Sequence, residues 1–279
     1  MVQIGIRLHD LEKGTIEERL PIVQRKGFSC VHLALSKTVQ EYSVKNAALT
    51  PGYAMYLQKL FVKNNVDIAV LGCYLNLANP NQKKLAEIQQ TYYAHIRFAA
   101  QISCGVVGTE TGAPNEAYVY EPASHGEEAL QTFIENLRPV IACAEKFGVV
   151  FAIEPVWNHI VYNSKRALEV LKAIDSPNLQ IIFDPVNLLS PENYENRETI
   201  IYQAIEDLST YIAVVHIKDF CIEHGKLISI AAGTGVMDYS QIMKFIKQEK
   251  PFVQVTLEDT APENAEMARE FVQMEYDKA

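Results

Sequence analysis

Eight short apolar segments alternate with helical patterns along the chain, and this alternation restricts the fold more than any other feature. The segments are rich in β-branched residues and bounded by glycine, proline or polar residues, as is typical of buried parallel strands. A chain of 279 residues is close to the ~250 typical of a (β/α)8 barrel. The pattern therefore predicts an α/β protein with one TIM-barrel domain over residues 1–279, whose strands cover 3–8, 28–35, 67–75, 106–109, 148–155, 179–184, 211–218 and 252–258.

Apolar residues at helical spacing separate these strands. The capping-box pattern Thr15-x-x-Glu18 predicts the start of the first helix, which should end near Gly27. Pro21 and Pro139 fall inside helical patterns, where proline bends a helix or marks a later start. The other helices are predicted at 51–64, about 85–102, about 130–147, 164–174, about 200–209, 239–247 and 262–275.

An open, doubly wound sheet is the main alternative fold. It usually carries a glycine-rich turn after its first strand, whereas this chain has Leu8-His9-Asp10 at that point. The net charge of -9 argues against a nucleic-acid-binding surface. The N-terminus does not resemble a signal peptide, and no apolar run reaches the ~18 residues of a membrane span. We therefore expect a cytoplasmic protein that binds neither nucleic acid nor membranes, with a homo-oligomer left open and its five cysteines reduced.

Four consecutive predicted strands end in a carboxylate or a histidine. Glu154 ends one apolar run, and Asp184, His216 and Glu258 occupy the matching position after the next three. In a parallel barrel these strand ends meet at one rim, where three carboxylates repel one another unless a divalent cation lies between them. Oxygen-rich ligation with a single histidine favours Mn²⁺, Mg²⁺ or Co²⁺, with Zn²⁺ as the alternative.

The motifs around these residues resemble those of the xylose isomerase-like sugar isomerase and epimerase barrels, and the likeness extends over nearly the whole chain. The resemblance implies a metal held by Glu154, Asp184, His216 and Glu258, a sugar or polyol substrate, and an acid/base role for the two glutamates. The motifs, in order, are Ile153-Glu154-Pro155, Phe183-Asp184-Pro185, His216-Ile217-Lys218-Asp219 and Leu257-Glu258-Asp259.

The chemistry of these residue types agrees with the resemblance but leaves the reaction open. Proton transfer next to a carbonyl passes through an enediolate, whose charge a bound cation stabilises. Glutamates on opposite faces of a ketose give epimerisation, and proton movement between adjacent carbons gives isomerisation. The alternative is a dehydratase of a cyclic keto-polyol such as inosose or dehydroshikimate. An endonuclease IV-like enzyme is disfavoured because it needs several more histidines at the strand ends, and a barrel without turnover is disfavoured by the two intact glutamates.

Six further residues near the strand ends are candidate substrate contacts. Many relatives carry a histidine three residues after the aspartate of strand six, where this chain has an asparagine that can bind a hydroxyl but cannot exchange protons. The single tryptophan follows Glu154 closely and can stack on a sugar face or pack in its loop. His32, inside the second strand, can face into the barrel or away from it. The six candidates are Asn187, Trp157, His159, Lys218, Glu110 and His9, with a structural role as the alternative for the last three.

Overall fold

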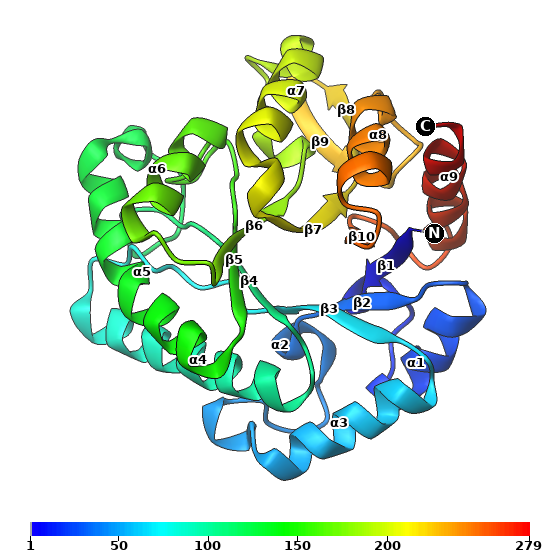
Figure 1. The fold of residues 1–279 in the computed structure, drawn as a ribbon, viewed down its shortest axis with the longest axis horizontal. Coiled ribbons are helices and arrows are strands. Elements are labelled where there is room, and N and C mark those ends of the chain that lie inside the picture. The colour runs from blue at the N-terminus through cyan, green and yellow to red at the C-terminus, as the bar shows by residue number, and fades with distance from the viewer. Residues whose placement is uncertain (1) are drawn as a thin grey trace.

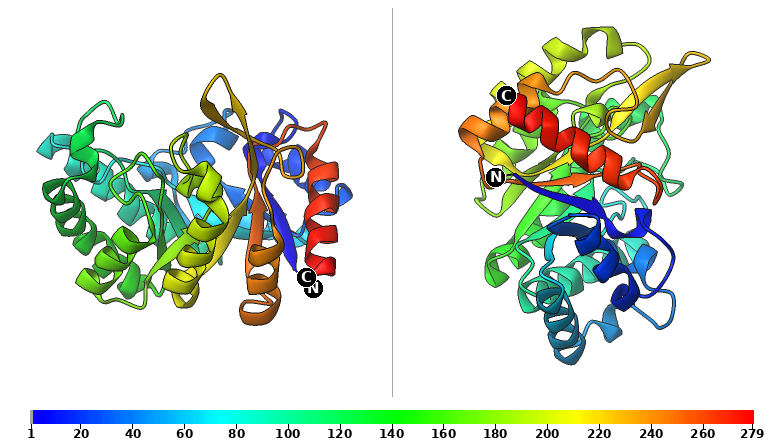
Figure 2. Two further views of the ribbon diagram at one scale, coloured as in Figure 1. Left: turned by 90° about the horizontal axis from the view of Figure 1, so that it is seen from above. Right: turned by 90° about the vertical axis from the view of Figure 1, so that its right-hand side faces the viewer.

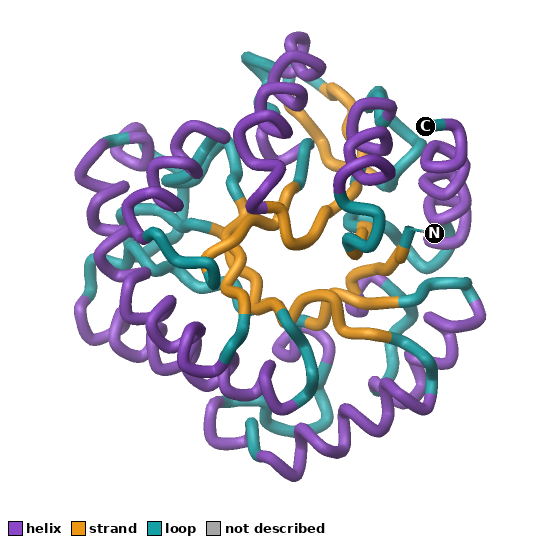
Figure 3. Tube along the Cα trace, in the orientation of Figure 1, coloured by secondary structure: helices purple, strands orange, loops and turns teal. Residues whose placement is uncertain are grey.

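Eight parallel strands close into a barrel in the computed structural model, which describes residues 2–279 (Figure 1). Figure 3 shows them as an inner ring enclosed by helices. The (β/α)8 prediction is confirmed, and the open-sheet alternative is wrong. In barrel order the strands are β1 (Gln3–Arg7), β10 (Gln254–Leu257), β7 (Ile212–Ile217), β6 (Leu179–Phe183), β5 (Val150–Glu154), β4 (Val106–Glu110), β3 (Asp67–Gly72) and β2 (Cys30–Leu33).

The helices follow the strands in sequence and pack around the barrel (Figures 1 and 2). The predicted capping box at Thr15 and Glu18 is present, and both Pro21 and Pro139 lie inside helices. The last helix was predicted from residue 262, but residues 262–264 form a turn that Asn264 closes by accepting the N–H of Ala261. The α-helices are α1 (Ile16–Arg25), α2 (Leu35–Thr38), α3 (Pro51–Lys63), α4 (Gln82–Gln101), α5 (Glu127–Phe147), α6 (Ser164–Ile174), α7 (Arg197–Leu208), α8 (Ser240–Glu249) and α9 (Ala265–Lys278).

Short 3-10 turns join several of these elements. They are η1 (Leu8–Asp10), η2 (Asn46–Ala48), η3 (Pro122–His125), η4 (Val186–Leu188), η5 (Tyr194–Asn196) and η6 (Ser209–Tyr211). The first of them explains why β1 ends one residue earlier than predicted. Within residues 2–279, no helix has the length and apolar character that a membrane span requires.

A β-hairpin after β7 is an element that the sequence analysis missed. β8 (Asp219–Glu223) and β9 (Lys226–Ile230) pair antiparallel and project from the barrel, as Figure 2 shows. Their two-residue turn, His224-Gly225, has positive φ at both positions, which is the geometry of the tight turn that suits twisted hairpins. The hairpin begins three residues after His216, at the carboxyl end of β7.

Small side chains inside the barrel make room for larger ones beneath the rim. A Cβ on Gly108 would lie 2.6 Å from Ile182 and 2.7 Å from Val70, so only glycine fits there. Ile182 and Val214 belong to a buried apolar cluster and precede Asp184 and His216 by two residues. Because side chains alternate along a strand, that spacing places the polar residue on the same face, one layer above the packed interior.

Candidate active site

The four predicted ligands meet at the carboxyl end of the barrel. Glu154 ends β5, Asp184 follows β6, His216 lies in β7 and Glu258 follows β10, and these four strands are consecutive neighbours. One possible ligand atom from each side chain lies within 4.8 Å of those of the others. All four residues are at most 5% exposed. The structure therefore brings together residues that are far apart in the sequence.

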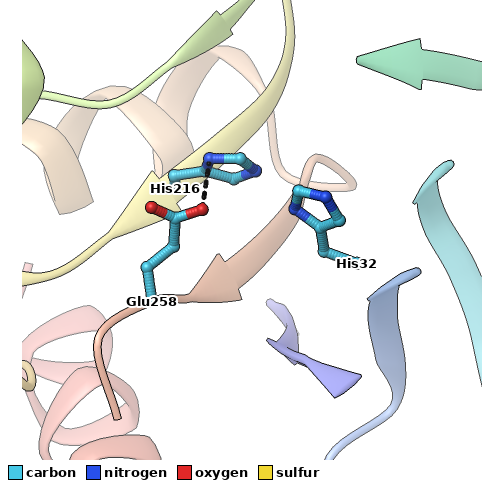
Figure 4. A group of neighbouring side chains, drawn as sticks. All are labelled: His32, His216 and Glu258. Carbon is cyan, nitrogen blue, oxygen red and sulfur yellow. Dashed lines mark ion pairs between the residues drawn. The ribbon is translucent and has the colours of Figure 1, made fainter. Parts of the chain in front are cut away.

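His216 lies between the two glutamates. Its Nδ1 is 3.3 Å from Glu154 Oε1 and 3.1 Å from Glu258 Oε1, and Figure 4 shows the Glu258 contact. Burial disfavours a charged imidazole, but Glu258 and Glu154 outweigh that effect and raise the pKa of His216 to about 10. The carboxylates thus favour a positive charge between them, either a proton on His216 or a cation in its place.

Lys218 supplies a second positive charge to the cluster. Its Nζ is 2.9 Å from Asp184 Oδ2, in an ion pair without hydrogen-bond geometry, and 3.2 Å from Glu258 Oε2. Burial disfavours the ammonium, but Asp184 and Glu258 raise the pKa of Lys218 above its ordinary value. The ion pair that was the alternative reading of Lys218 is present, and it is buried within the site.

The residues fit a divalent cation in both size and charge. Ligand atoms around an ion at about 2.0–2.2 Å lie up to about 4.4 Å apart, close to the spread seen here. Three carboxylates, with Lys218 beside them and a neutral imidazole, leave two negative charges to be balanced. The Asp184 carboxylate is held in place because its Oδ1 accepts the N–H groups of Val186 and Asn187. Its other oxygen, Oδ2, is paired with the Lys218 ammonium inside the cluster. A divalent cation matches this buried donor set.

Two of the four residues, Glu154 and Glu258, line a cavity of about 390 Å³, whereas Asp184 and His216 lie beneath its wall and do not line it. Its size lies in the range of small-molecule sites. Of the predicted substrate contacts, Asn187, Lys218, Glu110 and His9 line it, whereas Trp157 and His159 do not. The full lining comprises Arg7, His9, His32, Lys37, Tyr74, Glu110, Tyr118, Glu154, Asn187, Lys218, Glu258 and Asp259.

The sequence profile of the xylose isomerase-like TIM barrels matches residues 20–274. The chain belongs to this family. It is similar to the probable L-ribulose-5-phosphate 3-epimerase UlaE of Mycoplasma pneumoniae, with 28% identity over 139 residues. That match covers 50% of this chain and 42% of the relative, so it spans less than half of the relative's length.

Solved structures of related fold cover nearly the whole xylose isomerase-like chain. The 3-keto-D-glucoside 4-epimerase YcjR of E. coli has a TM-score of 0.78 with 13% identity, over 98% of this chain and 100% of that one. An IolI protein with a bound zinc atom has a TM-score of 0.75 with 19% identity, over 99% of both chains. An L-ribulose 3-epimerase has a TM-score of 0.74 with 14% identity, over 100% and 95%. At these identities the likeness concerns the fold.

The predicted substrate contacts have different neighbours in this xylose isomerase-like barrel, and some of them contact a candidate ligand directly. Asn187 donates its Nδ2–H to Glu154 Oε1 at 2.7 Å and so orients that carboxylate. Glu110 accepts a hydrogen bond from the Tyr118 hydroxyl at 3.0 Å, and burial raises the pKa of Glu110. His159 Nδ1 lies 4.0 Å from Glu110 Oε2. Trp157 lies beside Tyr120, with 6.1 Å between ring centroids, in the loop-packing arrangement that was its alternative.

His32 faces the site, which the sequence left open. Its ring stacks on His216 with centroids 5.3 Å apart and on Tyr74 at 5.6 Å, and Figure 4 shows it next to His216. A Cβ on Gly72 would lie 2.3 Å from His32 Nε2, so glycine makes this position available. His32 is 1% exposed, burial lowers its pKa well below the ordinary value, and neither ring nitrogen has a hydrogen-bond partner among the described residues. A ligand or water in the cavity can supply those hydrogen bonds.

Arg7 and Asp259 form an ion pair that the sequence analysis did not identify. Arg7 Nη2 lies 2.7 Å from Asp259 Oδ1, and its Nε lies 2.7 Å from Asp10 Oδ2. Its Nη1 is 3.6 Å from Glu258 Oε2. The guanidinium therefore links the end of β1 to the segment after β10 and supports Glu258. The available signal was weak: an arginine at the end of a strand is also common on protein surfaces.

Asp219 holds the loop that follows the hairpin. Its buried carboxylate accepts the N–H groups of Gly233, Gly235 and Met237 at 2.9–3.2 Å. A Cβ on Gly235 would lie 2.2 Å from the Phe220 carbonyl oxygen, so the loop requires glycine there. The Gly233-Thr234-Gly235 segment thus forms a turn, in which the Thr234 N–H donates to the Ala231 carbonyl oxygen. The motif His-Ile-Lys-Asp thus combines a candidate ligand, a buried cation and a loop anchor.

Proposed function

We propose that this protein is a metal-dependent sugar epimerase or isomerase that moves a proton on a carbon next to the ketone of a ketose or related polyol. The observation that carries the proposal is the pair of buried glutamates, Glu154 and Glu258, on either side of His216. Two carboxylates in one polar cavity can remove a proton from one position and return it at another. The similar Mycoplasma pneumoniae protein is named as a probable L-ribulose-5-phosphate 3-epimerase, and epimerisation belongs to this reaction class.

Glu154, Asp184, His216 and Glu258 would hold the divalent cation. When bound, the cation polarises the substrate carbonyl and lowers the energy of the enediolate. His216 and Lys218 lower the pKa of Glu258 well below its ordinary value, although burial acts in the opposite direction. Glu258 is therefore ionised and able to accept a proton. Asn187 orients Glu154, and the Lys218 ammonium stabilises negative charge that develops on a nearby substrate oxygen.

Solvent deuterium exchange tests this function directly. The protein is stripped of metal, reloaded with Mn²⁺, Mg²⁺, Co²⁺ or Zn²⁺, and incubated in D2O with a panel of ketoses and cyclic keto-polyols. We expect deuterium at the carbon next to the ketone, formation of an epimer or isomer, and loss of both with Glu154→Gln or Glu258→Gln. A new conjugated absorbance with loss of water identifies a dehydratase instead. No exchange with any metal and any substrate contradicts the proposal.

A further inference from the structure

A second cavity adjoins the one that Glu154 and Glu258 line. It has a volume of about 540 Å³ and is formed by the segments after β2 and β3 and by Thr91 and His95 of α4. Lys37 and Tyr74 line both cavities. The two spaces therefore adjoin at these residues, which follow β2 and β3 at the rim of the barrel.

Lys37 differs from the other lysine and from the arginine that line the active-site cavity. Arg7 is paired with Asp10 and Asp259, and Lys218 is paired with Asp184 and Glu258, as described above. Within residues 2–279, the Lys37 ammonium has neither a carboxylate within ion-pair distance nor a hydrogen-bond acceptor; its Nζ lies 6.0 Å from the centroid of the Tyr74 ring. Lys37, whose side chain is exposed, thus places a positive charge without an ion-pair partner among the described residues where the two cavities adjoin.

The second cavity is positive although the chain as a whole carries a net charge of -9. No aspartate or glutamate lines it, whereas Lys45 does, together with the hydroxyl of Ser36 and the amide of Asn46. Lys45 also forms no ion pair in the described part of the chain. Both lysines are exposed, and much of the remaining wall is apolar. The cavity is therefore complementary to a negatively charged group.

We propose that the two cavities form one extended site for a substrate with an anionic substituent. The ketose carbons that react lie against Glu154 and Glu258, and a phosphate ester or carboxylate at the far end of the same molecule is bound by Lys37, with Lys45 assisting. The reacting end of this inference rests on the proposed function. The anion-binding end rests only on the charges and shape of the second cavity.

Three ligands that differ only at their last carbon provide the test: D-fructose, D-fructose 6-phosphate and D-fructuronate. Their dissociation constants are measured by titration calorimetry on Mn²⁺-loaded protein, for the wild type, Lys37→Gln, Lys45→Gln and the control Lys172→Gln. Lys172 is an exposed lysine of α6 that lines neither cavity. Deuterium exchange is followed in the same samples, and the comparison is repeated with L-ribulose and L-ribulose 5-phosphate.

We expect an anionic ligand to bind the wild type about tenfold or more tightly than its neutral parent, as is typical of a charge-assisted contact. Lys37→Gln should remove most of that difference, Lys45→Gln a smaller part and Lys172→Gln none, while binding of the neutral sugar is unchanged. Whichever of the phosphate and carboxylate ligands binds more tightly identifies the anionic group that the site prefers.

Equal binding of neutral and anionic ligands in both series, or equal weakening of all ligands by Lys37→Gln, overturns the inference. Two mixed outcomes separate it from the proposed function. Charge-dependent binding through Lys37 without deuterium exchange supports the anion site and contradicts the proposed reaction. Exchange without any charge preference supports the reaction and contradicts the anion site.

Discussion

Over β5, β6, β7 and β10 the rim of the barrel consists of buried charges that contact one another, whereas over β2 and β4 it carries charges that lack such partners. Glu154, His216 and Glu258 are within 3.3 Å of a neighbour in the first region and are almost fully buried. In the second region, and among residues 2–279, Lys37 has no ion pair and Glu110 contacts a tyrosine hydroxyl in place of a lysine or arginine. The first region has the fixed geometry that chemistry requires, and the second retains charge that a substrate can use.

The largest effect should come from Glu258→Gln in the first region. The substitution keeps the shape of the side chain but removes its ability to accept a proton, so we expect turnover and deuterium exchange to fall by about 10³-fold or more. The fold should persist, as measured by circular dichroism and thermal unfolding. If the variant keeps wild-type turnover, Glu258 takes no part in the mechanism, and the two regions do not differ in their contribution to the chemistry.

Lys218→Met should mainly affect stability. Without the ammonium, Asp184 and Glu258 are buried beside each other with no lysine between them, and breaking a buried pair in this way costs about 3–5 kcal/mol. Urea denaturation measures the loss, with Lys172→Met as the matched control. Added Mn²⁺ should recover part of it because the cation replaces the missing charge. An equal loss in both variants means that Lys218 has no special electrostatic role.

The first region was predictable from the sequence, whereas in the second region only Glu110, at the end of a predicted strand, was identified. Glu154 and Asp184 each end an apolar run, so strand periodicity alone places them at one rim and on one face. Lys37 lies in α2, a four-residue helix after β2 that has no sequence pattern of its own. The orientation of His32 depends on Gly72 of the neighbouring strand, and the position of Tyr118 depends on a positive φ of 58° that tyrosine rarely adopts. These features arise from tertiary packing, which local periodicity does not encode.

Metal binding should stabilise the protein through the first region alone. At a free metal concentration of about 100 times Kd, binding contributes about 2.7 kcal/mol, which raises Tm by roughly 5 °C for a chain of this size. Thermal unfolding of EDTA-treated protein with and without Mn²⁺ measures this shift. Asp184→Asn should abolish it, and Glu110→Gln should leave it unchanged. If Asp184→Asn shows the same metal-dependent rise in Tm as the wild type, the ion binds at a different site.

The smallest effect should come from Glu110→Gln, which changes the second region without altering the size of the side chain. Glu110 lines the cavity and forms no ion pair with a lysine or arginine of the described residues, and its carboxylate accepts a hydrogen bond from the Tyr118 hydroxyl. If it also accepts a substrate hydroxyl, loss of its charge should raise KM about threefold to tenfold, equivalent to about 1 kcal/mol, and leave kcat nearly unchanged. Tyr118→Phe is the matched control, because it frees the carboxylate without removing it. A fall in kcat as large as that of Glu258→Gln contradicts the division, since Glu110 then takes part in the chemistry and the catalytic region extends across the barrel to β4.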